Sequence, residues 1–223
     1  MDTKEKILKA ALKLFNRDGI TDVTIRQIAA EVGISHGNLA YHYKNKKRII
    51  DEIYTHMDAE VSDAIFPEGD LSLEHYQRLL ERISRFQKKY RFFYMDMLEI
   101  KRQYPAVIKR YRETITTRSE QYHHLIDVFI EKGLIKKEAE PGFYKSLFHS
   151  IWVMSTFWLQ QKKILGKNHP LIKSGSDINH VWEILLPHLT KKGLRQYQSF
   201  NSKENETGSR ARPIQQVYLN QLN

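Results

Sequence analysis

The sequence predicts an all-α protein. Glycine and proline are scarce, at ten and six in 223 residues, and most of them separate segments in which apolar residues recur at helical spacing. No segment shows the strict apolar–polar alternation that is typical of a strand. We expect about nine helices, arranged as an N-terminal three-helix domain, a linker helix and a helical bundle.

The first 61 residues predict four helices. Asp2 with Glu5 and Thr24 with Gln27 have the spacing of capping boxes at the starts of the first and second helices. Gly33 follows the last apolar position of the second helix, where a left-handed glycine commonly ends a helix. The expected ranges are 3–18, 24–33, 35–43 and 46–61.

Longer helices are predicted beyond residue 70. Pro105 and Pro141 suit the first turn of a helix, where the missing N–H costs nothing. A bend is expected near Arg91, and Pro187 is expected to end or kink the last long helix. The predicted helices are 72–104, 105–132, 141–165 and 177–186. Because residues 197–223 are polar, we expect a loose tail and divide the chain into 1–61, 62–194 and 195–223.

Composition excludes several classes of protein. The chain has no cysteine, which excludes disulfides and thiolate metal sites and fits a cytoplasmic protein. The N-terminus lacks the order of a signal peptide, and the most apolar stretch, 147–159, is too short and too polar to span a membrane. No catalytic constellation is recognisable, so we expect no enzyme, no cofactor and no metal. His123 and His124 would point about 100° apart on a helix, so they make a poor pair of metal ligands.

The formal net charge of +10 suggests an anionic partner. Charge alone does not separate nucleic acid from a membrane surface, but no predicted helix is amphipathic with one sign of charge, so we expect no membrane partner. The strongest basic cluster in the first sixty residues is Lys44, Lys46, Lys47 and Arg48.

Residues 24–43 meet the requirements of a helix-turn-helix. Small Ala29 allows the next helix to approach closely, and Gly33 permits the turn. The remaining apolar residues of the motif are expected to form a small core: Ile28, Val32, Ile34 and Leu39.

The third helix carries short or planar polar groups that suit the major groove. Asn38 can read adenine in bidentate fashion, His36 can donate to guanine, and Gly37 allows a close approach of the backbone. The candidate DNA-binding residues are Thr24, Arg26, Ser35, His36, Gly37, Asn38, Tyr41, His42, Lys44 and Lys46. Structural alternatives exist, because Thr24 and Ser35 are also good helix caps, Tyr43 suits the core, and the lysines can form a solvated turn.

The run from Thr24 to Ser35, with Gly37-Asn38-Leu39, Tyr41-His42-Tyr43 and Lys46, resembles the DNA-binding domain of the TetR family of repressors. The resemblance implies phosphate contacts from Thr24, Tyr41, His42 and Lys46, and base or groove contacts from His36, Gly37 and Asn38. The sequence departs from the family pattern at Ala40, where an aromatic is common, and at Lys47, where an acid is frequent.

The resemblance also implies a homodimeric repressor that binds a palindromic operator in double-stranded DNA and is released by a small-molecule effector. The alternative is a DNA-binding protein of the same fold that has no effector and acts through protein partners or as an activator. Apolar stripes on the helices at 141–165 and 177–186 suit either the core or a four-helix dimer interface. Candidate effector contacts are Phe86, Tyr90, Phe93, Tyr94, Met97, Tyr122, His123, Ile126 and Trp152.

Overall fold

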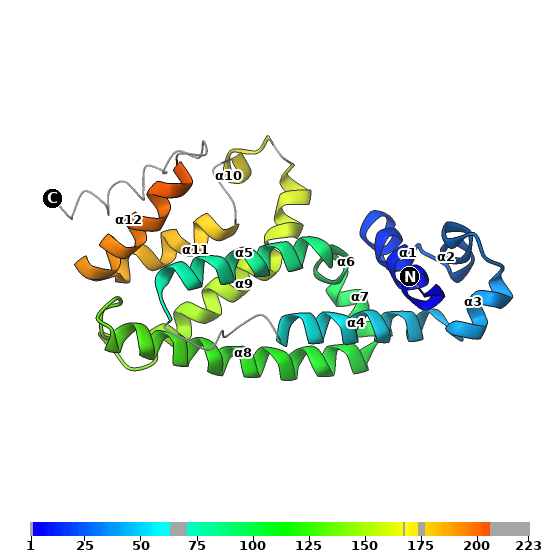
Figure 1. The fold of residues 1–223 in the computed structure, drawn as a ribbon, viewed down its shortest axis with the longest axis horizontal. Helices are drawn as coiled ribbons and strands as arrows, with labels where there is room; N and C mark the ends of the chain where they lie inside the picture. The colour runs from blue at the N-terminus through cyan, green and yellow to red at the C-terminus, as the bar shows by residue number, and fades with distance from the viewer. Residues whose placement is uncertain (1, 63–70, 167, 174–176, 206–223) are drawn as a thin grey trace. The chain divides into compact units, whose positions relative to one another are not determined.

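The computed structural model describes residues 2–62, 71–166, 168–173 and 177–205. Within these ranges it is all-α, as predicted, with twelve α-helices, one short 3₁₀ helix and a single isolated bridge pair, Ile135 with Leu189 (Figure 1). None of the described helices combines the length and apolar composition that crossing a bilayer requires. The helices are α1 (Thr3–Asp18), α2 (Ile25–Val32), α3 (His36–His42), α4 (Lys46–Ser62), α5 (Leu73–Lys89), α6 (Arg91–Met95), α7 (Met97–Gln103), α8 (Pro105–Glu131), α9 (Phe143–Leu165), α10 (Pro170–Lys173), α11 (Asp177–Leu185), η1 (Leu186–His188) and α12 (Lys191–Asn205).

The described residues form two compact units, one from residues 2–62 with 85–116 and the other from 71–84 with 117–205. This grouping does not follow the predicted division at residue 61, because residues 85–116 cluster with the N-terminal helices. The predicted boundary therefore remains a proposal about function. In the first unit, α1, α2 and α3 form one compact group of blue helices (Figure 1).

Two predicted helices differ from the observed ones. The predicted helix at 72–104 is broken at Tyr90 and again at Asp96, which places the first break beside the expected bend at Arg91. Pro105 opens α8 as predicted. Pro141 does not open α9, because the Glu138 carboxylate accepts the backbone N–H groups of Gly142 and Tyr144 and caps the helix two residues later.

The predicted loose tail is partly wrong. Residues 191–205 form α12, and its apolar residues Leu194, Tyr197 and Phe200 are buried. The Trp182 ring packs against the rings of Tyr197 and Phe200 at centroid distances of 4.7 and 5.8 Å. Three large side chains at helical spacing thus fold a segment whose overall composition is polar. Residues 206–223 lie outside the described residues.

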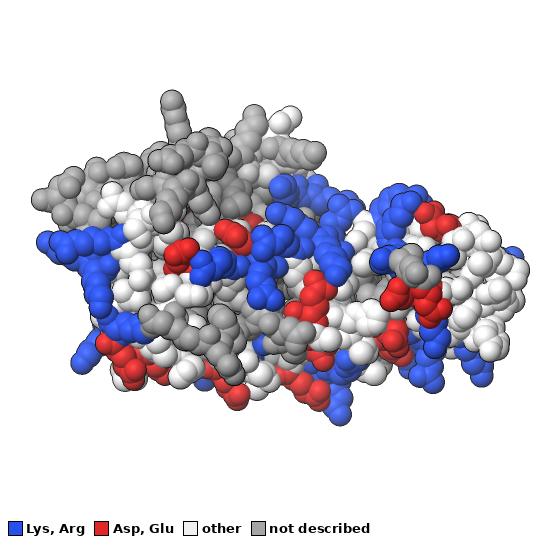
Figure 2. Space-filling view, viewed as in Figure 1, with Lys and Arg blue, Asp and Glu red and all other residues white. Residues whose placement is uncertain are grey.

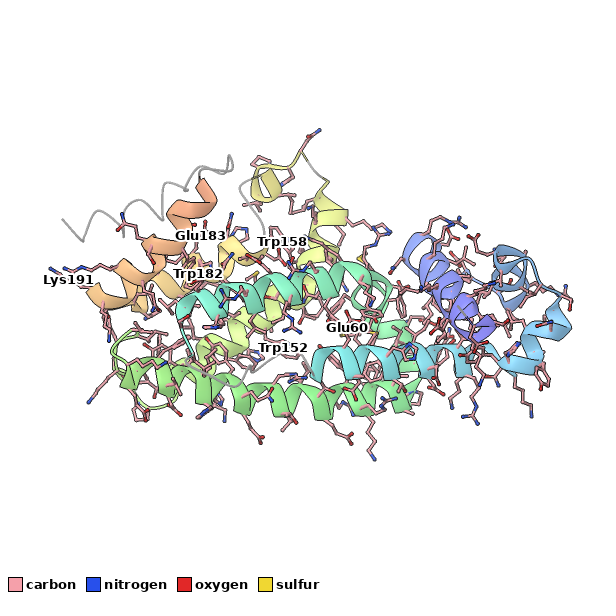
Figure 3. All side chains as sticks on the ribbon, in the orientation of Figure 1. Glu60, Trp152, Trp158, Trp182, Glu183 and Lys191 are labelled. Carbon is pink, nitrogen blue, oxygen red and sulfur yellow. The ribbon has the colours of Figure 1, made fainter. Side chains whose placement is uncertain are left out.

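The stripe predicted on the last long helix belongs to the core of the second unit. Val181, Trp182, Leu185, Leu186 and Leu189 are all buried within the chain. Figure 3 labels Trp182 where α11 lies beside α12. Of the two interpretations of this stripe, the core is the one that the structure supports.

Candidate nucleic-acid interface

The turn between α2 and α3 has the geometry that the sequence predicts. Thr24 caps α2: its hydroxyl accepts the backbone N–H of Gln27, and the Gln27 side chain accepts the N–H of Thr24 at 2.7 Å. Gly33 ends the helix in the left-handed region, with φ +75°. The N–H of Ile34 returns to the carbonyl of Ala29 at 3.0 Å, which satisfies one of the helix's terminal carbonyls.

A small apolar core fixes α3 against α2. Ile28 and Leu39 are completely buried, and Ala29 is nearly so. Tyr43 is also buried, which confirms its structural assignment, and burial raises the pKa of its hydroxyl. Because these side chains point inward, the opposite face of α3 is left for solvent or a partner.

The outer face of α3 presents polar and aromatic groups. His36, Gly37 and Asn38 are exposed, and Tyr41 is 87% exposed, the largest value among the large apolar side chains of the described residues. The Tyr41 ring meets the ring of half-buried His42 edge to face, with centroids 5.3 Å apart. Most of the Tyr41 ring is thus left accessible, so this face is available for contact with another molecule.

The hydroxyl of Ser35 accepts the backbone N–H of Asn38 at 3.1 Å and caps α3. Both Thr24 and Ser35 therefore act as caps in the free protein. Both are also exposed at helix N-termini, so the predicted phosphate contacts remain predictions.

Lys46 makes hydrogen bonds within the chain that the sequence did not predict. Its ammonium donates to the backbone carbonyls of Ile20 and Val23, the latter at 2.8 Å, with a longer contact to Thr21 at 3.4 Å. Burial lowers the pKa of Lys46, and the nearby charge of Asp22 opposes this only in part. The carbonyls lie in the turn between α1 and α2, where no helix pairs them. In the chain without DNA, Lys46 therefore holds this turn, and its predicted phosphate contact stays a prediction.

Arg26 and Lys44 are exposed and remain candidates for phosphate contact. On the face seen in Figure 2, lysine and arginine side chains lie among aspartate and glutamate side chains. On this face the basic side chains are thus interspersed with acidic ones, so charge alone does not mark an interface there.

Two family models match this chain. Residues 7–53 match the model described as bacterial regulatory proteins of the tetR family, and residues 54–197, more than half of the chain, match one described as bacterial transcriptional repressor. The chain belongs to the tetR family of bacterial regulatory proteins. Members of this family are DNA-binding transcriptional regulators, not enzymes, and α1 to α3 form the family's helix-turn-helix domain.

Individual relatives agree with this assignment. The class D tetracycline repressor of Escherichia coli is 32% identical over 75 residues, which cover only 34% of each chain. The HTH-type transcriptional regulator YttP of Bacillus subtilis is 23% identical over 196 residues, covering 70% of this chain and 95% of YttP. A crystal structure of a TetR-family regulator from Marinobacter aquaeolei superposes with a TM-score of 0.81 at 27% identity, covering 91% of this chain and 98% of the other.

Sequence reasoning missed the contacts that hold the helix-turn-helix domain from the side of α6. The Asn16 amide donates to the carbonyl of Lys89 at 2.7 Å and accepts the N–H of Phe92 at 2.8 Å. The Asp96 carboxylate accepts the N–H of Ile20 at 2.7 Å. Each partner lies more than seventy residues away, so no local pattern signals the pairing.

Five of the predicted effector contacts lie in the first unit, and four of them, Phe86, Tyr90, Phe93 and Tyr94, have ring or hydrogen-bond partners there. The Tyr90 hydroxyl donates to the Glu60 carboxylate at 2.8 Å (Figure 3 labels Glu60). Phe93 packs against the rings of Tyr54 and Tyr94 at 5.6 Å. These contacts favour packing for most of this group, which comprises Phe86, Tyr90, Phe93, Tyr94 and Met97.

The other four, Tyr122, His123, Ile126 and Trp152, lie in the second unit. Tyr122 and Ile126 are buried, and His123 and Trp152 are half-buried. An open groove of about 310 Å³ between α1 and α2 is lined by none of the nine predicted residues. The role of these four residues in binding an effector stays a prediction.

Proposed function

We propose that this TetR-family protein is a homodimeric repressor that binds a palindromic operator and is released from it by a small molecule. The observation that carries the DNA-binding part is the outer face of α3, where Asn38 and Tyr41 are exposed while Leu39 is buried. A short helix held this way offers its N-terminal residues to base edges in a major groove.

The test is fluorescence anisotropy with duplex DNA from the region upstream of the protein's own gene, with a random duplex as reference. Asn38→Ala is expected to weaken binding to the cognate duplex by about 1–3 kcal/mol, roughly 5- to 150-fold. Binding to the random duplex is expected to change little, because phosphate contacts supply most non-specific affinity. Equal losses on both duplexes would remove Asn38 from base reading.

The dimer is supported by an exposed apolar stripe on α9. Val153, Phe157 and Ile164 are 38%, 42% and 73% exposed, and their spacing of four and seven residues places them on one side of the helix. A stripe of this kind suits an isologous contact in which α9 packs against its copy. Two copies would also present two recognition helices to the two halves of a palindrome.

Sedimentation velocity tests this interface. The wild-type protein is expected to sediment with twice the 26.5 kDa mass of the chain, and Phe157→Glu as a monomer. Lys162→Glu, which also adds a carboxylate at an exposed position of α9, is the matched control and is expected to remain dimeric. A Phe157→Glu dimer of unchanged affinity would place the interface elsewhere.

Release by an effector is a linkage effect: a molecule that binds more tightly to the form with poorly spaced recognition helices must weaken DNA binding by the same factor. The family includes repressors named for a small molecule, tetracycline, which supports this part of the proposal. If no metabolite that binds the protein changes its operator affinity, the alternative without an effector is preferred.

A further inference from the structure

Two neighbouring residues of α8 in the second unit carry buried polar atoms without a partner. The hydroxyl oxygen of Tyr122 and Nε2 of His123 are inaccessible to solvent, and neither has a hydrogen-bond partner among the described residues. The Tyr122 side chain as a whole is only 8% exposed. Buried polar groups of this kind are rare in folded proteins because they lose their bonds to water and gain none in return.

Two other buried polar groups of the same unit have hydrogen-bond partners. The indole N–H of Trp182 donates to the side-chain oxygen of Gln77 at 2.6 Å, and the hydroxyl of Tyr144 donates to the carbonyl of Lys136 at 2.6 Å. These two donors thus find partners within the unit. The Tyr122 hydroxyl and Nε2 of His123 differ from them in this respect.

The surroundings of these two residues are aromatic. The ring of Phe148, on α9, lies 4.6 Å from the ring of Tyr122 and 6.1 Å from that of His123, measured between centroids. Trp152, labelled in Figure 3, follows Phe148 by one turn of α9. Burial raises the pKa of the Tyr122 hydroxyl, which keeps its proton and remains a hydrogen-bond donor.

We propose that Tyr122 and His123 are the polar anchors of a small-molecule site between α8 and α9, and that its ligand is a largely apolar ring compound with one hydroxyl or carbonyl group. The apolar rings around the anchors favour a flat, apolar ligand body. A hydroxyl group on the ligand can bond to either atom, because it accepts from the Tyr122 hydroxyl and can also donate to a ring nitrogen. The inference rests on the proposed function only in identifying this site as the effector site.

The first test concerns the free protein. Because the Tyr122 hydroxyl has no partner, Tyr122→Phe is expected to leave the melting temperature unchanged or to raise it. Tyr144→Phe is the matched control, since it removes a hydroxyl that is bonded, and it is expected to lower the melting temperature by about 2–4 °C. If Tyr122→Phe lowers it as much as the control, the hydroxyl already has a partner, such as a buried water, and the proposal is wrong.

The second test uses two probes with the same ring system, 2-naphthol and naphthalene, in calorimetric titrations of the full-length protein. Only 2-naphthol carries a hydroxyl, and it is expected to bind about tenfold more tightly, which corresponds to about 1.4 kcal/mol. Tyr122→Phe is expected to reduce this ratio to about one or two. Tyr144→Phe is expected to leave the ratio near ten.

Equal binding of the two probes to the wild-type protein, or no binding of 2-naphthol, would overturn the assigned ligand class. A ratio that survives in Tyr122→Phe would overturn the role of the anchor. Neither measurement involves DNA. Failure of the repressor proposal would therefore appear in the anisotropy experiments, while failure of this site would appear in the titrations.

Discussion

Replacement of Lys46 by methionine separates a structural lysine from a phosphate-binding one. Methionine keeps an unbranched apolar stem but removes the ammonium, so the carbonyls of Ile20 and Val23 lose their charged donor. Both carbonyls lie in the connection between α1 and α2, which sets where α2, and with it α3, begins. Loss of these bonds is therefore expected to destabilise the helix-turn-helix domain.

The expected magnitude follows from the contacts. A hydrogen bond to a charged group contributes about 1.5–3 kcal/mol, and Lys46 makes two short ones to Ile20 and Val23. The lowered pKa of Lys46 indicates that burying its charge costs part of that gain. We therefore expect a net loss of about 2 kcal/mol, which for a chain of this length lowers the melting temperature by about 4–8 °C.

Thermal melts and the salt dependence of DNA binding are the two measurements, with Lys44→Met as the control. Lys44 is exposed, so its replacement is expected to leave the melting temperature unchanged and to reduce the slope of log K against log salt by about 0.9, the value of one phosphate contact. Lys46→Met is expected to show the opposite pattern. If Lys46→Met melts like the wild type and loses about 0.9 in slope, the ammonium leaves its carbonyls for a phosphate, and our reasoning is refuted.

Three other perturbations test separate contacts. Gly37→Ala is expected to preserve the melting temperature, because an added Cβ would lie 3.9 Å from its nearest neighbour, and to weaken operator binding in the anisotropy assay. Gly33→Ala is the contrast: at φ +75° a side chain is strained, so this variant is expected to destabilise the fold. Asn16→Ala removes the bonds to Lys89 and Phe92 and is expected to lower the free energy of unfolding by about 1–3 kcal/mol in urea melts; an unchanged midpoint would contradict this. Burial disfavours the charged form of Glu60, but hydrogen bonds from Lys89 and Tyr90 outweigh burial and lower the pKa of the carboxyl. The charged Glu60 therefore stabilises the fold above about pH 4.3, and this stabilisation is lost as the pH falls further. In acid titrations followed by circular dichroism, Glu60→Gln is expected to lack this part of the loss of stability.

Local interactions made much of the helix-turn-helix domain predictable. The Thr24 cap and the left-handed Gly33 depend on residues at most four positions away, so their sequence spacing is sufficient to predict them. The separation of buried Leu39 from exposed Asn38 and Tyr41 follows from helical periodicity alone. Helical spacing is therefore enough to separate the buried and exposed positions of α3, whereas Val32 and Ile34, also predicted for the core, are only half-buried.

Other features of the chain do not follow from local sequence patterns. Asp2 is the N-terminal cap residue of α1, but its side chain accepts no capping bond, so the predicted box with Glu5 does not form. Lys46 has the sequence context of a surface cation, and only the folded turn shows that unpaired carbonyls lie within its reach. The helix α12 was missed because three apolar residues, not its average composition, determine its burial.

The connection between α1 and α2 is held from two elements by groups of opposite charge. The backbone carbonyl of Ile20 accepts the ammonium of Lys46 at the start of α4, while its N–H donates to the carboxylate of Asp96 at the junction of α6 and α7. Each charged group thus meets the backbone group of complementary polarity, so neither can move far from Ile20 without leaving a polar group unpaired. A displacement of α4 or of the α6–α7 junction would therefore displace the start of α2, and α3 with it. We therefore expect the orientation of α3 to depend on these two charged side chains, although neither of them lies on α3.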